Sequence, residues 1–222
     1  LSWAIDENLQ LWYPCNNITI QWCIISEGLH NSLHTKRPHS CGLLIGNYAK
    51  NISAHHNLLA HNDGRSPLMK QGTESEIINN VVYNWGDFGA TRISNWERAD
   101  ADILSNIIGN YYIPGTNSSI KPIDLNAPDR LREGTRIFVK DNIGPGRKSD
   151  DIDDWALVSG PEKFRANQPT FPLSNVSVTS ASTAYDQVIK YAGAVAPKRD
   201  MVDKRVTHSV LNRTGSIIDS QN

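Results

Sequence analysis

The sequence predicts an all-β fold, a right-handed single-stranded parallel β-helix with C-terminal helices and loops packed on it. Two observations support this prediction: a short strand-like unit recurs up to about residue 146, and successive units carry a polar residue at the same place. Units of this size cannot each bury an apolar face alone. Stacked coil on coil, they pair their strands in parallel and share one continuous core.

The repeated unit is a strand-like stretch followed by one residue of fixed position and then two aliphatic residues. Four segments align in this way, with Cys23, Asn57, Asn80 and Asn106 at the fixed position. A weaker fifth copy places Asn142 there. An Asn side chain can donate to and accept from its equivalent in the next coil, and Asn tolerates the left-handed backbone of a sharp corner. The repeat therefore predicts an asparagine ladder inside the coils.

The spacing of the units separates this fold from its nearest competitor. A leucine-rich repeat also places Asn after a strand, but the L-x-x-L-x-L spacing is missing and Val and Ile favour strands. The step from the first unit to the second is lengthened by an insertion from about Glu27 to Gly42. We expect this insertion to leave the stack as a loop.

The chain beyond about residue 146 is expected to cover the coils. Residues 142–154 are rich in Gly, Pro and Asp, which is typical of a loop. Residues 179–194 predict a helix capped by Ser182 or Thr183 and ended by Gly193, and residues 202–211 predict a second helix closed by Gly215. We expect one domain over residues 1–222, with coils at about 1–146 and a C-terminal loop and helical region at about 147–222.

Composition excludes several classes of partner. The 222 residues carry a formal net charge of −1, so nothing in the composition favours binding to nucleic acid or to an anionic membrane. No apolar run is long enough for a transmembrane helix. The chain opens at Leu1 without a signal-peptide pattern, and we expect any export signal to lie upstream.

The cysteines do not form a recognisable metal or redox motif. Cys15, Cys23 and Cys41 are an odd number without C-x-x-C spacing, which argues against a cysteine zinc site. Pairing of Cys15 or Cys23 with Cys41 stays open. Cys23 lies in an apolar run and is expected to be a buried thiol.

Three clusters carry groups able to do chemistry: residues 6–8, the His- and Lys-rich residues 30–39, and residues 62–72. Equivalent strands of adjacent coils lie about 4.8 Å apart, so distant segments can line one groove on the outside of the stack. The third cluster belongs to the stretch NISAHHNLLAHNDGRSPLMKQG at 51–72, which IINNVVYNW follows at 77–85.

This stretch resembles the core of polysaccharide lyase family 1, the pectate lyases. In that family a His-His-Asn strand precedes Arg-x-Pro-x-x-Arg-x-Gly and then an Asn-Asn strand. The segment 184–219 resembles the end of bacterial and fungal members, while the family's N-terminal coils are absent. The resemblance implies a secreted, monomeric enzyme that cleaves the acidic plant cell-wall polymer (1→4)-α-D-galacturonan by Ca²⁺-assisted β-elimination.

The resemblance also assigns roles to individual residues. Arg65 takes the place of the proton-abstracting arginine, and Lys70 replaces a second arginine that holds a substrate carboxylate. Asp6 matches the first carboxylate of the family's calcium segment; Gln10 stands at the second, so Glu7 is the candidate replacement. The substrate-binding lysine falls in the insertion, where His30, Lys36 and His39 are the candidates and Lys36 is preferred.

The chemistry of an acidic sugar fits such a set. The proton α to a carboxylate is very weakly acidic until that carboxylate is neutralised and the developing charge is held, which Ca²⁺ and cationic side chains can do. A guanidinium is normally always protonated. An alternative is therefore that Arg65 only stabilises charge while a nearby His acts as the base.

Two other functions compete with a lyase. A polygalacturonase-like hydrolase on the same fold needs carboxylates at a hydrolytic spacing, but the dense acidic set at 150–154 lies beyond the coils. A non-catalytic β-helix that binds polysaccharide is the second alternative, favoured by Lys70 and Gln10. Trp85 and Trp96 are candidates to stack on sugar rings or to pack in the fold.

Overall fold

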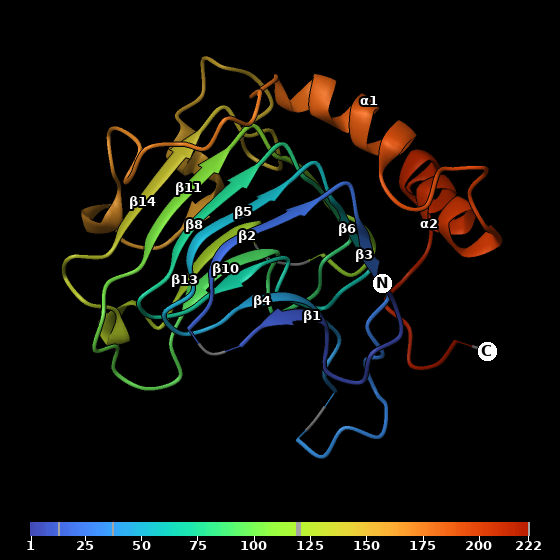
Figure 1. Cartoon of the computed structure of the whole chain (residues 1–222), viewed down its shortest axis with the longest axis horizontal. Helices are drawn as coiled ribbons and strands as arrows, with labels where there is room; N and C mark the ends of the chain where they lie inside the picture. Colours follow the sequence, from blue (N-terminus) through green and yellow to red (C-terminus); the bar gives the residue numbers. More distant parts are fainter. Residues whose placement is uncertain (13, 37, 119–120, 222) are drawn as a thin grey trace.

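The computed structural model describes residues 1–12, 14–36, 38–118 and 121–221. Its strands form three parallel sheets, with neighbour orders β1-β4-β7-β10-β13-β15 in the first sheet, β14-β11-β8-β5-β2 in the second and β12-β9-β6-β3 in the third. Up to β13, strand numbers rise by three between neighbours because the chain passes once through each sheet before it returns (Figure 1). This arrangement is a parallel β-helix, which confirms the predicted fold class.

The first sheet consists of β1 (Glu7–Leu11), β4 (Cys41–Ile45), β7 (Leu68–Met69), β10 (Thr91–Ser94), β13 (Ile123–Asn126) and β15 (Val158–Ser159). The second consists of β2 (Asn16–Gln21), β5 (Lys50–His55), β8 (Glu74–Ile78), β11 (Leu104–Ile108) and β14 (Arg136–Lys140). The third consists of β3 (Ile24–Ser26), β6 (Leu58–Ala60), β9 (Val81–Tyr83) and β12 (Tyr111–Ile113). Three short 3₁₀ turns (Pro128–Arg130, Asp154–Leu157 and Glu162–Phe164) and the helices α1 (Ala181–Tyr191) and α2 (Met201–Asn212) complete the described elements.

The core is built from rows of aliphatic side chains, one from each coil. One such row runs through the second sheet, where the strand register aligns Ile20, Ala54, Ile77, Ile107 and Val139. All five are buried in the main core cluster. Because each coil buries its row against the next, the apolar surface removed from water grows with every coil added.

The asparagine ladder lies at the corner between the second and third sheets. The side-chain amide of Asn57 donates to Oδ1 of Asn80 at 3.0 Å, Asn80 donates to Asn110 at 3.0 Å, and Asn110 donates to Asn142 at 2.9 Å. The backbone N–H of Cys23 donates to Oδ1 of Asn57, so Cys23 holds the equivalent place in the first coil. The ladder prediction is confirmed for Asn57, Asn80 and Asn142.

The prediction that Asn106 belongs to the ladder is wrong. Asn106 lies inside β11, where its side chain accepts from the backbone N–H of Thr170 at 2.8 Å. The two Ile residues after Asn106 imitate the repeat, whereas the true corner residue, Asn110, is followed by two Tyr residues. Corner position, not the type of the following residues, decides membership in the ladder.

The C-terminal region covers two of the three sheets. Side chains on the outside of the second sheet hold the tail, since Asn106 and Asn79 accept from the backbone N–H groups of Thr170 and Thr179. Helices α1 and α2 (orange and red in Figure 1) pack on the third sheet, where Val188 joins a second apolar cluster with strand residues of β3, β6, β9 and β12. No helix of the described residues is long and apolar enough to cross a membrane.

Both predicted helices are present, with different ends. The N-cap of α1 is Ser180, whose hydroxyl accepts from the backbone N–H of Thr183 at 3.2 Å, so the capping residue is neither Ser182 nor Thr183. Helix α2 ends at Asn212 with Arg213 in the left-handed conformation, before Gly215 is reached. The stack itself extends past residue 146, because β15 pairs with β13. The three cysteines are free thiols; Cys41 is buried and Cys23 only partly so.

Candidate functional site

A pocket of about 440 Å³ lies on the outer side of the first sheet. Its lining residues come from β4, β7, β10, β13 and the loops that join them: Lys36, Pro38, His39, Cys41, Arg65, Leu68, Phe88, Arg92, Ser94, Trp96 and Asn126. Successive coils supply them, as expected for a groove that runs along a stack. Three of the predicted site residues, Lys36, His39 and Arg65, are among them.

Arg65 is held by close backbone packing just before β7. Its own backbone is left-handed, with φ of 56°, and its carbonyl accepts from the N–H of Leu43. A Cβ at Gly42 would lie 2.8 Å from this carbonyl oxygen, so only glycine permits the approach. The Arg65 guanidinium pairs closely with Glu7 and lies 3.5 Å from Oδ1 of Asp6. Burial lowers the pKa of Arg65, and the Asp6 carboxylate opposes that shift.

Lys70 follows β7 and is almost completely buried, with 2% of its surface exposed. Its ammonium nitrogen lies 3.3 Å from the centre of the Trp96 ring. Burial lowers the pKa of Lys70 to about 8; the nearby Arg65 charge acts in the same direction and Glu97 opposes it. The contact with the indole face compensates part of the lost hydration.

Trp96 is the residue around which the cations gather. It is 50% exposed, and the Lys36 ammonium and the Arg65 guanidinium each lie 5.9 Å from its ring centre. Arg92 lies in the pocket one coil beyond, 3.4 Å from Asp124. A half-exposed indole ringed by cations is suited to an acidic sugar, because the ring can stack on the pyranose face while the cations bind carboxylates.

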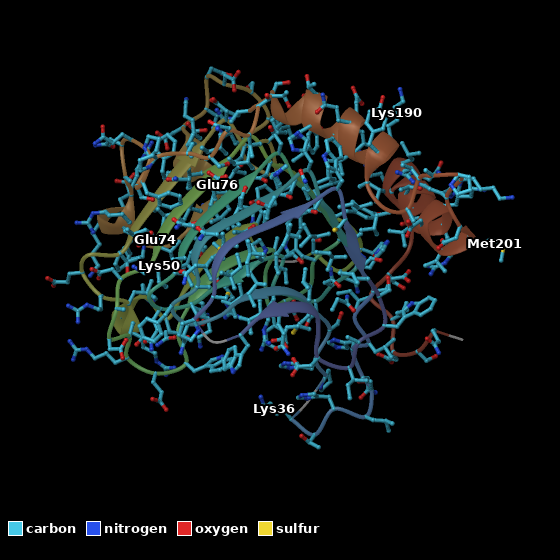
Figure 2. All side chains as sticks on the ribbon, viewed as in Figure 1. Lys36, Lys50, Glu74, Glu76, Lys190 and Met201 are labelled. Carbon is cyan, nitrogen blue, oxygen red and sulfur yellow. The ribbon has the colours of Figure 1, made fainter. Side chains whose placement is uncertain are left out.

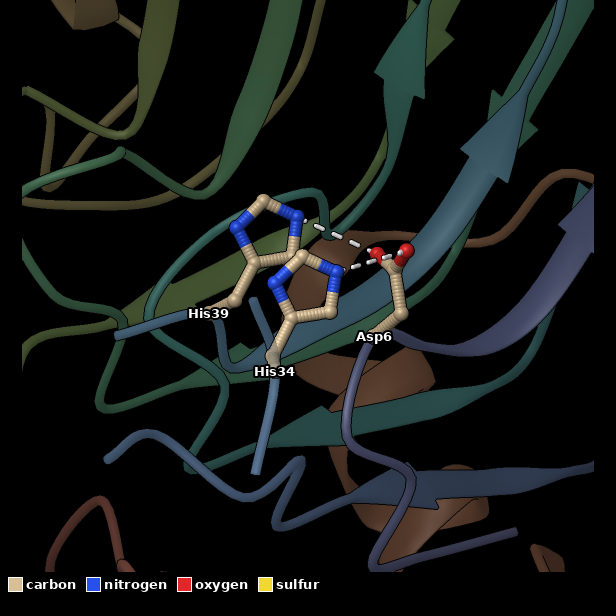
Figure 3. Close-up of side chains that lie close together, drawn as sticks. All are labelled: Asp6, His34 and His39. Carbon is tan, nitrogen blue, oxygen red and sulfur yellow. Dashed lines mark ion pairs between the residues drawn. The ribbon is translucent and has the colours of Figure 1, made fainter. Parts of the chain in front are cut away.

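Asp6 faces two histidines of the insertion, which spans residues 27–40 between β3 and β4. Its carboxylate oxygens lie 3.4 Å from Nε2 of His34 and 3.1 Å from Nε2 of His39 (Figure 3). Burial lowers the pKa of His39, and the Asp6 charge opposes this. The Glu7 side chain is buried against Arg65.

The structure therefore brings all six predicted site residues into one region. Lys36 reaches this region from the insertion, and Figure 2 labels it at the lower edge of the molecule. Sequence reasoning missed Arg92 and His34. Arg92 could have been found only from the strand register, which places it beside Leu68 on one side and Asp124 on the other.

One of the two candidate tryptophans packs in the core and the other is exposed to a substrate. Trp85 is 1% exposed and packs in the core, edge-on to Tyr112, so it is not available to a sugar. Trp96 is exposed at the pocket. The pair His55 and His56 lines a different pocket, beside the second sheet.

The acidic set at 150–154 serves the fold. Its Asp154 lies 3.0 Å from the buried Arg147 guanidinium and 3.3 Å from the Lys140 ammonium, while Asp153 binds Arg165 at 2.8 Å. These ion pairs join β14 to the following loops. They give no support to a hydrolase.

The donors around Asp6 fit Ca²⁺ poorly among the described residues. Calcium takes six to eight oxygen ligands. Here Asp6 offers one carboxylate to two imidazoles and a guanidinium, and Glu7 is engaged by Arg65. Asp6 and Glu7 as calcium ligands therefore stay a prediction, and we derive no step of the chemistry through calcium.

Comparison with known proteins supports the resemblance. Probable pectate lyase C of Neosartorya fischeri is 32% identical over 221 residues, which cover 95% of this chain and 46% of the relative. Probable pectate lyase C of Aspergillus flavus is 29% identical over 228 residues, covering 100% and 50%, and that of Aspergillus terreus is 38% identical over 146 residues, covering 61% and 32%. The chain spans about half the length of the curated relatives it matches. No family model matches it. The chain is therefore a parallel β-helix that is similar along nearly its whole length to probable pectate lyases.

Proposed function

We propose that the chain carries the catalytic groove of a pectate lyase that cleaves (1→4)-α-D-galacturonan by β-elimination. The observation that carries this proposal is the convergence of Arg65, Lys70 and Lys36 on the half-exposed ring of Trp96. A polymer with one carboxylate per sugar needs this combination of repeated cations and a stacking surface. The relatives named as probable pectate lyases add independent support.

In this proposal Arg65 removes the C5 proton of the galacturonate whose own C4–O glycosidic bond is to be cleaved. The electron pair of the C5–H bond forms the C4–C5 double bond, the C4–O bond breaks, and the departing oxygen takes up a proton. Arg65 is the base only while its guanidine is neutral, so its contact with Glu7 must open when substrate binds. Burial of Arg65 favours the neutral form and thus supports this role.

Lys70, Lys36 and Arg92 bind carboxylates along the groove, and His39 forms part of its wall beside Asp6. Each cation lowers the free energy of the developing negative charge next to C5. Calcium, held by Asp6 and Glu7, would supply neutralisation of the substrate carboxylate on C5. We further propose that the protein acts outside the cell, because a polymeric substrate cannot enter a cell. We also propose that it acts as a monomer.

The test is an assay on polygalacturonate with added Ca²⁺ or with a chelator, following the absorbance of the unsaturated product. Wild type is expected to raise this absorbance. Arg65→Ala should lower kcat by about 10²–10⁴-fold, the range for loss of a general base. The matched control is Arg132→Ala, which should keep full activity. Arg132 is an exposed arginine that pairs with Asp102 outside the pocket.

Three other outcomes would contradict the proposal. New reducing ends without unsaturated product would indicate hydrolysis. Binding without any product would indicate a polysaccharide-binding module. Full activity in Arg65→Ala would move the base elsewhere, with His39 the first histidine to test.

A further inference from the structure

Two histidines of the insertion and one aspartate before β1 form a compact donor cluster beside the pocket. Figure 3 shows the rings of His34 and His39 stacked on each other, with an Nε2 of each directed at the Asp6 carboxylate. The ring centres lie 4.5 Å apart and the planes differ by 8°. The three side chains come from segments about thirty residues apart in sequence, so the fold, and not local sequence, assembles them.

The Asp6 carboxylate forms ion pairs with both histidines, but the contact with His39 is not a well-formed hydrogen bond. Oδ1 of Asp6 and Nε2 of His39 lie 3.1 Å apart and are buried, and neither has a hydrogen-bond partner among the described residues. Buried polar atoms are normally satisfied by protein, water or an ion. A cation bound by both side chains would satisfy these two atoms, which the ion-pair contact alone does not.

The spacing fits a metal smaller and softer than calcium. Two ligands on a tetrahedral Zn²⁺ with bonds of about 2.0–2.1 Å are about 3.3 Å apart. Nε2 of His39 lies 3.1 Å from Oδ1 of Asp6, and Nε2 of His34 lies 3.4 Å from Oδ2 of Asp6. One ligand atom from each of the three residues can be chosen so that all three lie within 4.8 Å of one another. Imidazole nitrogen is a ligand of Zn²⁺ and other transition metals, whereas Ca²⁺ takes oxygen.

We propose that Asp6, His34 and His39 bind a transition-metal ion of the Zn²⁺ class, with a fourth position left open. Arg65 lies 3.5 Å from Oδ1 of Asp6 and would repel the ion, but its close pairing with Glu7 gives it a second anionic partner. The ion would tie the insertion to the first coil. Because Lys36, Pro38 and His39 line the pocket, this bond would fix one wall of the groove.

The test is calorimetric titration of the metal-free chain with ZnCl₂. Wild type is expected to bind one equivalent. His34→Gln and Asp6→Asn should each weaken Zn²⁺ binding by at least about 10–100-fold. Loss of a side chain that only orients a metal ligand already has an effect of this size, and loss of the ligand itself should cost no less. His30→Gln is the matched control, because His30 belongs to the same insertion but lies beside Asp63.

Two further readouts do not depend on enzyme activity. Co²⁺ in place of Zn²⁺ should give visible absorption bands of a low-coordinate site in wild type and not in His34→Gln. Zn²⁺ should also slow backbone hydrogen exchange across residues 27–40. Circular dichroism without metal shows whether each variant is folded.

The proposal is overturned if His34→Gln and Asp6→Asn bind Zn²⁺ as tightly as wild type, or if His30→Gln weakens binding as much as His34→Gln. It is equally overturned if only Ca²⁺ gives binding heat. None of these results depends on polysaccharide cleavage, so the metal site and the proposed function fail separately.

Discussion

Lys70 keeps an ammonium group beneath the indole of Trp96 while almost none of its surface reaches solvent. Its pKa, lowered to about 8 chiefly by burial, places its charge within reach of ordinary assay conditions. If Lys70 binds a substrate carboxylate, KM for polygalacturonate should rise as the pH passes above about 8, since the neutral amine binds the anion less well. Lys70→Arg should remove this rise, because a guanidinium stays charged. A KM that is flat from pH 7 to roughly pH 10 in wild type would contradict this role.

The lowered pKa of Lys70 also predicts how the free energy of unfolding depends on pH. Its folded pKa lies below the unfolded value, so between about 8 and 10.5 the unfolded state binds more protons than the folded state. Stability should therefore rise with pH through this window, once the remaining groups are accounted for. Urea unfolding of wild type and Lys70→Met across the window measures the difference. The rise in wild type should be larger than in Lys70→Met, and equal curves would show that the pKa is not lowered.

Gly42 sets the position of Arg65 through the backbone. Gly42→Ala would drive a methyl group into the Arg65 carbonyl, which lies 2.8 Å from the required Cβ position. A displacement of about 1 Å at a catalytic group can lower the rate by about 10²-fold. We expect kcat to fall by about 10–100-fold. The unfolding transition should stay cooperative, and an unchanged kcat would show that the Arg65 loop tolerates the shift.

At the scale of elements, the ladder at the corner of the coils stabilises the stack by hydrogen bonds. Asn80 donates to the Ala54 carbonyl and to Asn110, and it accepts from both the backbone and the side chain of Asn57. Asn80→Ala leaves several buried groups unpaired, each worth about 1–3 kcal/mol, so we expect a loss of at least about 3 kcal/mol. Chemical denaturation measures it.

The matched control for that measurement is Asn51→Ala. Asn51 also donates to an Asn of the neighbouring coil, Asn17, but this pair is exposed. Water replaces an exposed hydrogen bond, so the loss should come mainly from placing Ala at the left-handed backbone of Asn51, where φ is 53°, and should stay below about 2 kcal/mol. Equal losses in both variants would show that burial adds nothing to the ladder.

The sequence predicted the strands and helices better than the corner residues and the contacts between coils. The repeat predicted the coils because strand, corner and strand follow one another in every unit. The apolar face of residues 181–191 predicted helix α1. Asn106 was misassigned because its neighbours imitate the unit, while Asn110 is followed by aromatic residues that the pattern did not admit. Arg65 was found from a local motif. Arg92 and His34 acquire their places only through pairing between coils or through the course of a loop, which local sequence does not encode.

At the scale of the whole molecule, a near-neutral chain concentrates cations on one face. The formal net charge is −1, yet Lys36, Arg65, Lys70 and Arg92 gather at a single groove. Binding of polygalacturonate should therefore weaken as salt rises, although the chain as a whole does not attract anions. Lys36→Ala should reduce the salt slope of the dissociation constant by roughly a third, because Lys36 is one of the three cations proposed to bind carboxylates.

The control for the salt slope is Lys190→Ala on α1, because Figure 2 shows Lys190 at the opposite side of the view from Lys36. This variant removes the same charge from the surface and should leave the slope unchanged. Equal slopes for Lys36→Ala and Lys190→Ala would show that net charge, and not the groove, governs binding.

The ladder leaves the length of each coil free. Successive ladder residues are separated by 23, 30 and 32 positions, yet each step makes the same amide contact of about 3 Å. Chain can therefore be added or removed at the other corners without breaking the register of the stack. Evolution can reshape the groove by lengthening one loop at a time, and a designer could exchange the 27–40 insertion for another while keeping the core unchanged.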